Sequence, residues 1–80
     1  MNERLKFKGR LAEMEVEAKR LKLRMDGFVR SIRDALDPFE DPADLACDVA
    51  AEQAVELAAL QADYKAALAE ITAIKKALGR

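Results

Sequence analysis

The stretch Asp37-Pro38-Phe39-Glu40-Asp41-Pro42 lies at the middle of the 80-residue chain and contains both of its prolines. Pro38 disfavours the α conformation at Asp37 because its ring crowds the preceding backbone. A helix that arrives from the amino-terminal side should therefore end near Leu36 or Asp37.

The second half of the same stretch carries signals for a new helix. Asp41 is a favourable N-cap, and Pro42 suits the first helical position, where its missing N–H costs nothing. A loop of about five residues forces the flanking helices to lie side by side and antiparallel. The sequence therefore predicts one all-α domain over residues 1–80, a coiled-coil-like helical hairpin. Its parts are a first helix over about 3–36, a loop over about 37–41 and a second helix over about 42–78.

Apolar residues recur at alternating spacings of three and four in both arms, which is the pattern of a coiled-coil seam. In the first arm the seam consists of Phe7, Leu11, Met14, Ala18, Leu21, Met25, Phe28, Ile32 and Ala35. In the second arm it consists of Leu57, Leu60, Tyr64, Ala67, Ile71, Ile74 and Leu78, with a weaker continuation at Ala43, Ala46, Ala50 and Gln53. The first seam passes through Gly27, so we expect one uninterrupted helix there. Gly79 suits the C′ position that follows a helix.

The two seams come into register when the chain is folded about Phe39 and Glu40. This register places Leu11 opposite Ala67 and Leu68. The side chains expected in the core are Leu11, Met14, Leu21, Met25, Phe28, Ile32, Leu57, Leu60, Tyr64, Ile71 and Ile74. We also expect Cys47 to be a small buried apolar residue, rather than a surface thiol.

The composition argues against an enzyme. The chain has no histidine and one cysteine, so it cannot by itself build a disulfide, a zinc site of the usual kind or a histidine-assisted nucleophile. We predict no catalytic, cofactor-binding or metal-binding residues and no cofactor. A lone cysteine fits a reducing compartment, and no apolar run reaches the length of a signal peptide or membrane span. The expected location is cytoplasmic, without membrane association.

Several apolar residues lie off the seams and would stay uncovered in a single hairpin. Uncovered apolar surface of this kind usually marks an interface. We therefore predict a homodimer in which two hairpins form a four-helix bundle. The alternatives are a helical partner protein and a harmless scatter of apolar residues over a soluble surface. The candidate dimer interface consists of Val16, Leu23, Val29, Leu36, Val49, Val55 and Leu68.

The charges are unevenly distributed, although the formal net charge is only −1. Residues 34–56 carry eight carboxylates and no lysine or arginine. The other end carries a candidate basic tip that we expect to be unneutralised within one hairpin. Its residues are Arg4, Lys6, Lys8, Arg10, Lys75 and Lys76. Such a tip can lie beside the acidic end of an antiparallel partner, can bind nucleic acid, or can remain solvated.

Three segments carry a resemblance to a known group of proteins. They are Ser31-Ile32-Arg33-Asp34-Ala35-Leu36-Asp37-Pro38-Phe39-Glu40, Ala50-Ala51-Glu52-Gln53-Ala54-Val55-Glu56-Leu57 and Ile74-Lys75-Lys76-Ala77-Leu78-Gly79-Arg80. The chain resembles the small uncharacterised helical-hairpin proteins of Mu-like prophages over nearly its whole length. This resemblance implies a bacterial, cytoplasmic and phage-derived context, and it implies no activity.

The sequence thus favours a non-enzymatic structural or protein-interaction module that self-associates through apolar helix faces. The alternative function is a small nucleic-acid-associated accessory protein that uses the basic tip. Against it stand the acidic far end and the scarcity of aromatic residues for stacking on bases.

Overall fold

The computed structural model describes residues 2–79, and its first long helix, α1, spans Glu3–Ala35. Asn2 caps the start of α1, because its side-chain oxygen accepts a hydrogen bond from the N–H of Leu5 at 3.3 Å. The helix continues through Gly27 without a break, as the seam predicted. Its C-cap is Leu36, so the helix ends where Pro38 was expected to end it.

The second long helix, α2, spans Cys47–Ala77. Leu78 is its C-cap, and the backbone N–H of Leu78 donates to the carbonyl of Ile74 at 3.0 Å. Gly79 follows with a φ of 78°, the left-handed conformation that glycine adopts most easily. The prediction that Gly79 occupies the C′ position is therefore confirmed.

The prediction that the second helix begins near Pro42 was wrong. Asp41 accepts the N–H of Ala43 at 2.9 Å, but this cap starts only a short 3₁₀ helix, η1, over Pro42–Asp44. Leu45 is then extended, with a ψ of 137°. The N–H of Ala46 donates to the carbonyl of Ala35 at 3.0 Å. This hydrogen bond joins the residue before α2 to the last residue of α1. It is a tertiary contact, and it outweighs the local capping signal of Asp41 and Pro42.

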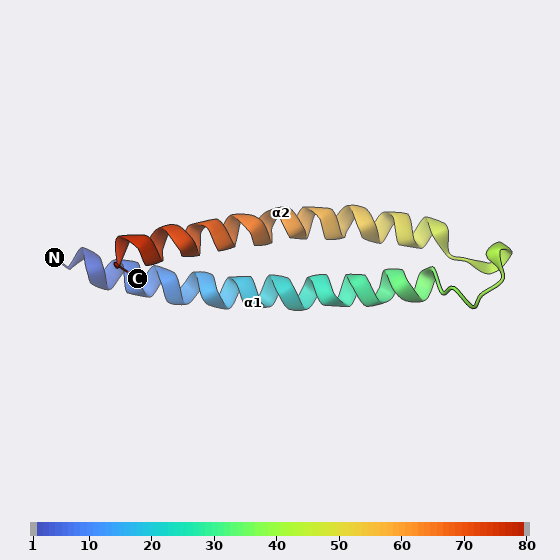
Figure 1. The fold of residues 1–80 in the computed structure, drawn as a ribbon, viewed down its shortest axis with the longest axis horizontal. Coiled ribbons are helices and arrows are strands. Elements are labelled where there is room, and N and C mark those ends of the chain that lie inside the picture. Colours follow the sequence, from blue (N-terminus) through green and yellow to red (C-terminus); the bar gives the residue numbers. More distant parts are fainter. Residues whose placement is uncertain (1, 80) are drawn as a thin grey trace.

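The two long helices run antiparallel along the whole molecule, and the connection forms one end of the rod (Figure 1). The molecule measures 63 × 16 × 16 Å along its principal axes. The residues from 2 to 79 contain no strand. The predicted fold class, an all-α helical hairpin, is confirmed.

The core is a single layer of seam residues between α1 and α2. Its buried side chains are Leu11, Ala18, Leu21, Ala50, Leu60, Ala67, Ile74 and Leu78. The half-buried side chains packed against them are Met14, Met25, Phe28, Tyr64 and Ile71. The other two expected core residues, Ile32 and Leu57, are also half-buried. Every residue predicted for the core therefore lies on the interhelical face, but no large side chain of the described residues is completely buried.

The register of the two helices differs from the predicted one. Leu11 packs with Ile74 and Leu78, whereas the sequence placed it opposite Ala67 and Leu68. The physical reason is the longer connection, which delays the start of α2 and brings later residues opposite α1. As a result, the first turn of α1 extends past the end of α2 (Figure 1).

Three further expectations fail near the ends of the hairpin. Phe7 was placed on the seam, but it lies in the second turn of α1, before the residues that α2 covers, and is exposed. Cys47 was expected to be buried, but it is the first residue of α2 and its thiol is exposed. The weak continuation of the second seam also fails at Ala43 and Ala46, which are exposed in the connection and at the cap of α2.

Candidate functional site

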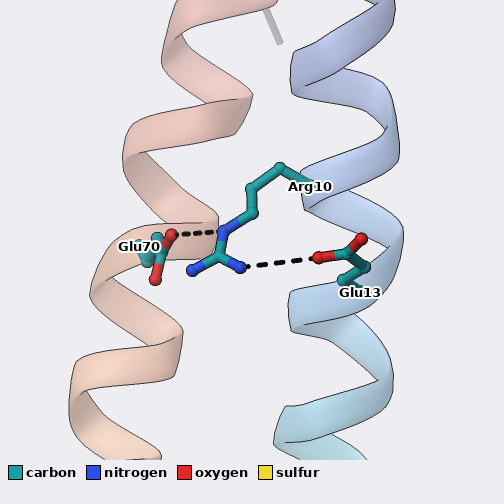
Figure 2. A network of polar contacts seen from close by, with 3 residues as sticks. All are labelled: Arg10, Glu13 and Glu70. Atoms are coloured by element: carbon teal, nitrogen blue, oxygen red, sulfur yellow. Dashed lines mark hydrogen bonds and ion pairs between the residues drawn. The ribbon is translucent and has the colours of Figure 1, made fainter.

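Arg10 joins the two helices through an ion pair (Figure 2). Its Nε donates to Oε1 of Glu70 on α2 at 2.8 Å, and its Nη1 lies 3.5 Å from Oε2 of Glu13 on α1. The hydrogen bond and the charge of Glu70 raise the pKa of Arg10 above its ordinary value. Arg10 was assigned to an unneutralised basic tip, and the structure corrects this, because Glu70 of α2 lies beside Arg10 and neutralises its charge.

The remaining basic residues of this end are exposed: Arg4, Lys6, Lys8, Lys75 and Lys76. Within residues 2–79, none of them has a carboxylate within 4.0 Å. Arg80 lies outside the described residues. Five cations thus remain available at this end of the rod, and they belong to the start of α1 and the last turn of α2.

The opposite end is acidic and presents one aromatic side chain. The connection between α1 and α2 carries Asp37, Glu40, Asp41 and Asp44 and contains no lysine or arginine. Phe39 at its middle is 95% exposed. The sequence treated Phe39 only as part of a turn, and nothing in the apolar spacing would have marked it as a surface residue of this kind.

All seven residues of the candidate dimer interface are exposed in the hairpin. Their positions relative to the seam nevertheless divide them between different faces. Val29, Leu36 and Leu68 flank the seam on the side opposite the Arg10–Glu70 ion pair. Val49 flanks it on the same side as that ion pair. The other three point away from the seam on the outer surfaces of the two helices: Val16, Leu23 and Val55. One flat interface cannot contain all seven.

The hairpin also has an open groove of about 350 Å³ beside the seam, lined by Arg24, Gly27, Phe28, Ser31 and Gln53. The Oε1 atom of Gln53 is itself buried and accepts no hydrogen bond from residues 2–79. Gln53 occupies a seam position in the weak part of the second arm, so its amide takes the place of an apolar side chain. The polar amide therefore packs unfavourably in the core. The groove offers no convergent set of polar groups for a ligand.

Comparison with family models, curated proteins and solved structures found no match for this chain. The described part of the chain holds no cluster of three or more potential metal ligands. Neither α1 nor α2 is apolar enough over a sufficient length to cross a membrane. The surface features described above are therefore the basis for any functional argument.

Proposed function

We propose that this protein is a non-enzymatic structural or protein-interaction module that self-associates into an antiparallel dimer, a four-helix bundle of two hairpins. The observation that carries the proposal is the imbalance between a thin core and a rich apolar surface. No large side chain of the described residues is completely buried, whereas Val16, Leu23 and Val55 are each about 70% exposed. A small domain with so limited a core usually gains stability from a partner.

The exposed area of the hairpin supports the same conclusion. The chain of 8.9 kDa exposes 6090 Å². A compact monomer of this mass would expose about 4,800 Å². The excess of roughly 1,300 Å² exceeds the approximately 800 Å² that each partner buries in a standard protein interface. One copy can therefore bury a standard interface and still expose no less surface than a compact protein.

One side of the hairpin is best suited to this contact. Val29, Leu36 and Leu68 lie there, flanking the seam. The same side of α2 presents further exposed small or apolar residues: Cys47, Ala51, Ala54 and Ala58. No charged residue of α2 interrupts this run between Cys47 and Ala58 on that side. A second hairpin can pack against it as in other four-helix bundles.

The two charged ends favour an antiparallel arrangement of the copies. A parallel pair would place one acidic connection beside the other, and one basic end beside the other. An antiparallel twofold pair instead places each acidic connection beside the basic end of the other copy. The charges thus favour one orientation of the two copies, while burial of the apolar side supplies the main driving force for association.

The test is the solution mass by light scattering across protein concentration, combined with two paired variants. Val29→Gln with Leu68→Gln should raise the dimer dissociation constant by at least about tenfold, because two apolar contacts are lost. Val16→Gln with Val55→Gln changes the outer surfaces and serves as the matched control. A wild-type chain that stays monomeric at every concentration would contradict self-association. A dimer weakened only by the control pair would move the interface to the outer surfaces.

A nucleic-acid-associated accessory protein is the second candidate. The five exposed cations at the basic end favour it, and phosphate contacts through them would weaken steeply with salt. Binding of DNA or RNA at low salt should then be lost when Arg4, Lys6 and Lys8 are changed to glutamine. Absence of binding at low salt would remove this candidate.

For the setting of the protein, we propose the bacterial cytoplasm and a phage-derived origin. The exposed thiol of the single cysteine is compatible with a reducing compartment. The resemblance to the small proteins of Mu-like prophages supports the same setting. Fractionation of the producing cells, with the protein found outside the cytoplasmic fraction, would refute the location.

A further inference from the structure

Among residues 2–79, the start of α1 has no neighbouring helix beside it. Leu78, the C-cap of α2, packs with Leu11, so the residues before Leu11 lie at or beyond the last turn of α2 (Figure 1). We call Glu3–Lys8 the N-terminal overhang. It contains two exposed apolar side chains, Leu5 at 66% and Phe7 at 38%. Phe7 continues the seam of α1, but α2 ends too early to cover it.

The N-terminal overhang is also basic. Arg4, Lys6 and Lys8 alternate with the two apolar side chains, and only Glu3 opposes them. These cations lie near the positive end of the α1 dipole, which makes their position unfavourable within one hairpin. An anionic partner at this place would relieve that repulsion. A partner that covers the overhang well must therefore be acidic and must also supply an apolar group.

The connection at the other end of the same molecule has both properties. We call Leu36–Ala46 the acidic connection, and its four carboxylates surround the 95% exposed Phe39. Asp37 fixes the backbone next to Phe39, because its Oδ1 accepts the N–H of Phe39 at 2.9 Å and its carbonyl accepts the N–H of Glu40 at 3.1 Å. Phe39 is thus presented to solvent by an ordered turn, at a small entropic cost for binding.

The overhang and the acidic connection cannot meet within one chain, because they lie at opposite ends of a rod 63 Å long (Figure 1). They can meet only between copies. In an antiparallel twofold pair each connection lies beside the overhang of the other copy, so the same contact forms twice.

We infer that the acidic connection of each copy docks on the N-terminal overhang of the other, with Phe39 covering Leu5 and Phe7 while the carboxylates face Arg4, Lys6 and Lys8. This inference rests on the proposed function, since it requires an antiparallel pair of hairpins. It adds a second contact at each end of the bundle, distinct from the apolar side. Helix faces rich in alanine and leucine can slide along one another, whereas this contact sets the orientation and the axial register of the two copies.

The first experiment is a charge exchange followed by light scattering at low salt. Glu40→Lys with Asp44→Lys reverses the connection, and neither carboxylate makes a hydrogen bond among residues 2–79. Lys6→Glu with Lys8→Glu reverses the overhang and suits a helix start. Each double variant alone should raise the dimer dissociation constant about tenfold or more. A mixture of the two should restore wild-type affinity as a heterodimer, because both of its contacts are attractive.

The matched control is Arg20→Glu with Arg30→Glu, which changes the net charge as much as the overhang variant but acts at the middle of the rod, on the outer surface of α1 and away from Val29 and Leu68. An equal loss of affinity in this control would show that net charge alone is responsible and would overturn the inference. Two double variants that dimerise as tightly as the wild type would also overturn it, and the proposed function would stand.

The second experiment observes position 39 directly. The chain contains no tryptophan, so Phe39→Trp introduces a single reporter. Its emission should shift to shorter wavelength over the same concentration range in which the mass doubles. A mass that doubles while the emission remains that of a solvent-exposed tryptophan would overturn the docking of the connection and leave self-association intact. A mass that never doubles would refute the proposed function, and the inference with it.

Discussion

The Nε of Arg10 lies 2.8 Å from Oε1 of Glu70, and this ion pair joins α1 to α2 near the open end of the hairpin. The two residues are 60 positions apart in the sequence, and their meeting depends on the register of the helices. Figure 2 shows that the same guanidinium also turns towards Glu13 one turn further along α1. The charge of Arg10 is therefore neutralised within the hairpin. The basic end consists of the neighbouring cations that have no such partner among residues 2–79.

Replacing Glu70 with glutamine should lower the thermal midpoint slightly at low salt. The pair is solvent-exposed, so its contribution is small and is screened by added salt. The difference from the wild type should disappear in concentrated salt, as measured by circular dichroism. Glu13→Gln is the control, because it removes only the contact within α1. A larger effect from Glu13→Gln than from Glu70→Gln would contradict the assignment of Glu70 as the principal partner.

Shortening a buried side chain of the seam should destabilise the hairpin. Leu21 and Leu60 belong to the same buried cluster, and replacing either with alanine should lower the free energy of unfolding by about 2–5 kcal/mol. Leu23→Ala, on the outer surface of α1, should change it by less than about 0.5 kcal/mol when the chain is monomeric. Urea unfolding at fixed protein concentration measures all three variants. Equal values for Leu21 and Leu23 would refute the core assignment.

Gly27→Ala should stabilise the hairpin by about 1 kcal/mol, since glycine in a helix interior is unfavourable. A Cβ atom at this position would meet nothing within 4 Å. Gly79→Ala should have the opposite sign and cost about 1 kcal/mol, because the φ of 78° disfavours a side chain. Thermal unfolding of the two variants checks both signs. Stabilisation by both would mean that Gly79 does not hold the left-handed conformation.

Gln53→Leu should also stabilise the hairpin. The Oε1 atom of Gln53 is buried without a hydrogen-bond partner, and such an atom costs about 1–3 kcal/mol. Leucine has a similar size and suits the seam position. The gain should appear in the urea midpoint, whereas Gln61→Leu, at an exposed position of α2, should give little change. A loss of stability on Gln53→Leu would indicate that the amide has a partner in solution.

Acid should remove one electrostatic contribution from α1. The hydrogen bond from Arg20 is the main reason that the pKa of Glu17 lies below its usual 4.5. The unfolded chain therefore takes up this proton at a higher pH than the folded chain does. The contribution is complete above the unfolded pKa and is lost as the pH falls through the folded pKa. Glu17→Gln should be less stable than the wild type near neutral pH, and the two should converge in acid. A gap that persists in acid would contradict this account.

The sequence predicted the helical hairpin because the signals for helix ends and for apolar helix faces come from residues close together in the chain. Pro38 ends α1 through a clash with its own neighbour, and the spacing of Leu11, Leu21, Leu60 and Ile74 places them on one face of a helix wherever that helix lies. Asn2 and Gly79 act in the same way, through bonds to residues a few positions away. The candidate interface could be identified as exposed by its distance from the seam, although its division between faces required the paired helices.

The register was decided only by the tertiary structure. The local signal of Asp41 and Pro42 favoured a helix start, but the bond between Ala46 and Ala35 delayed α2 to Cys47. That delay exposes Phe7 and leaves the overhang uncovered. A residue's capping and periodicity depend on neighbours within about one turn of helix. The register of two long helices depends on the length of the connection between them. That length is set by a contact between residues that meet only in the folded molecule.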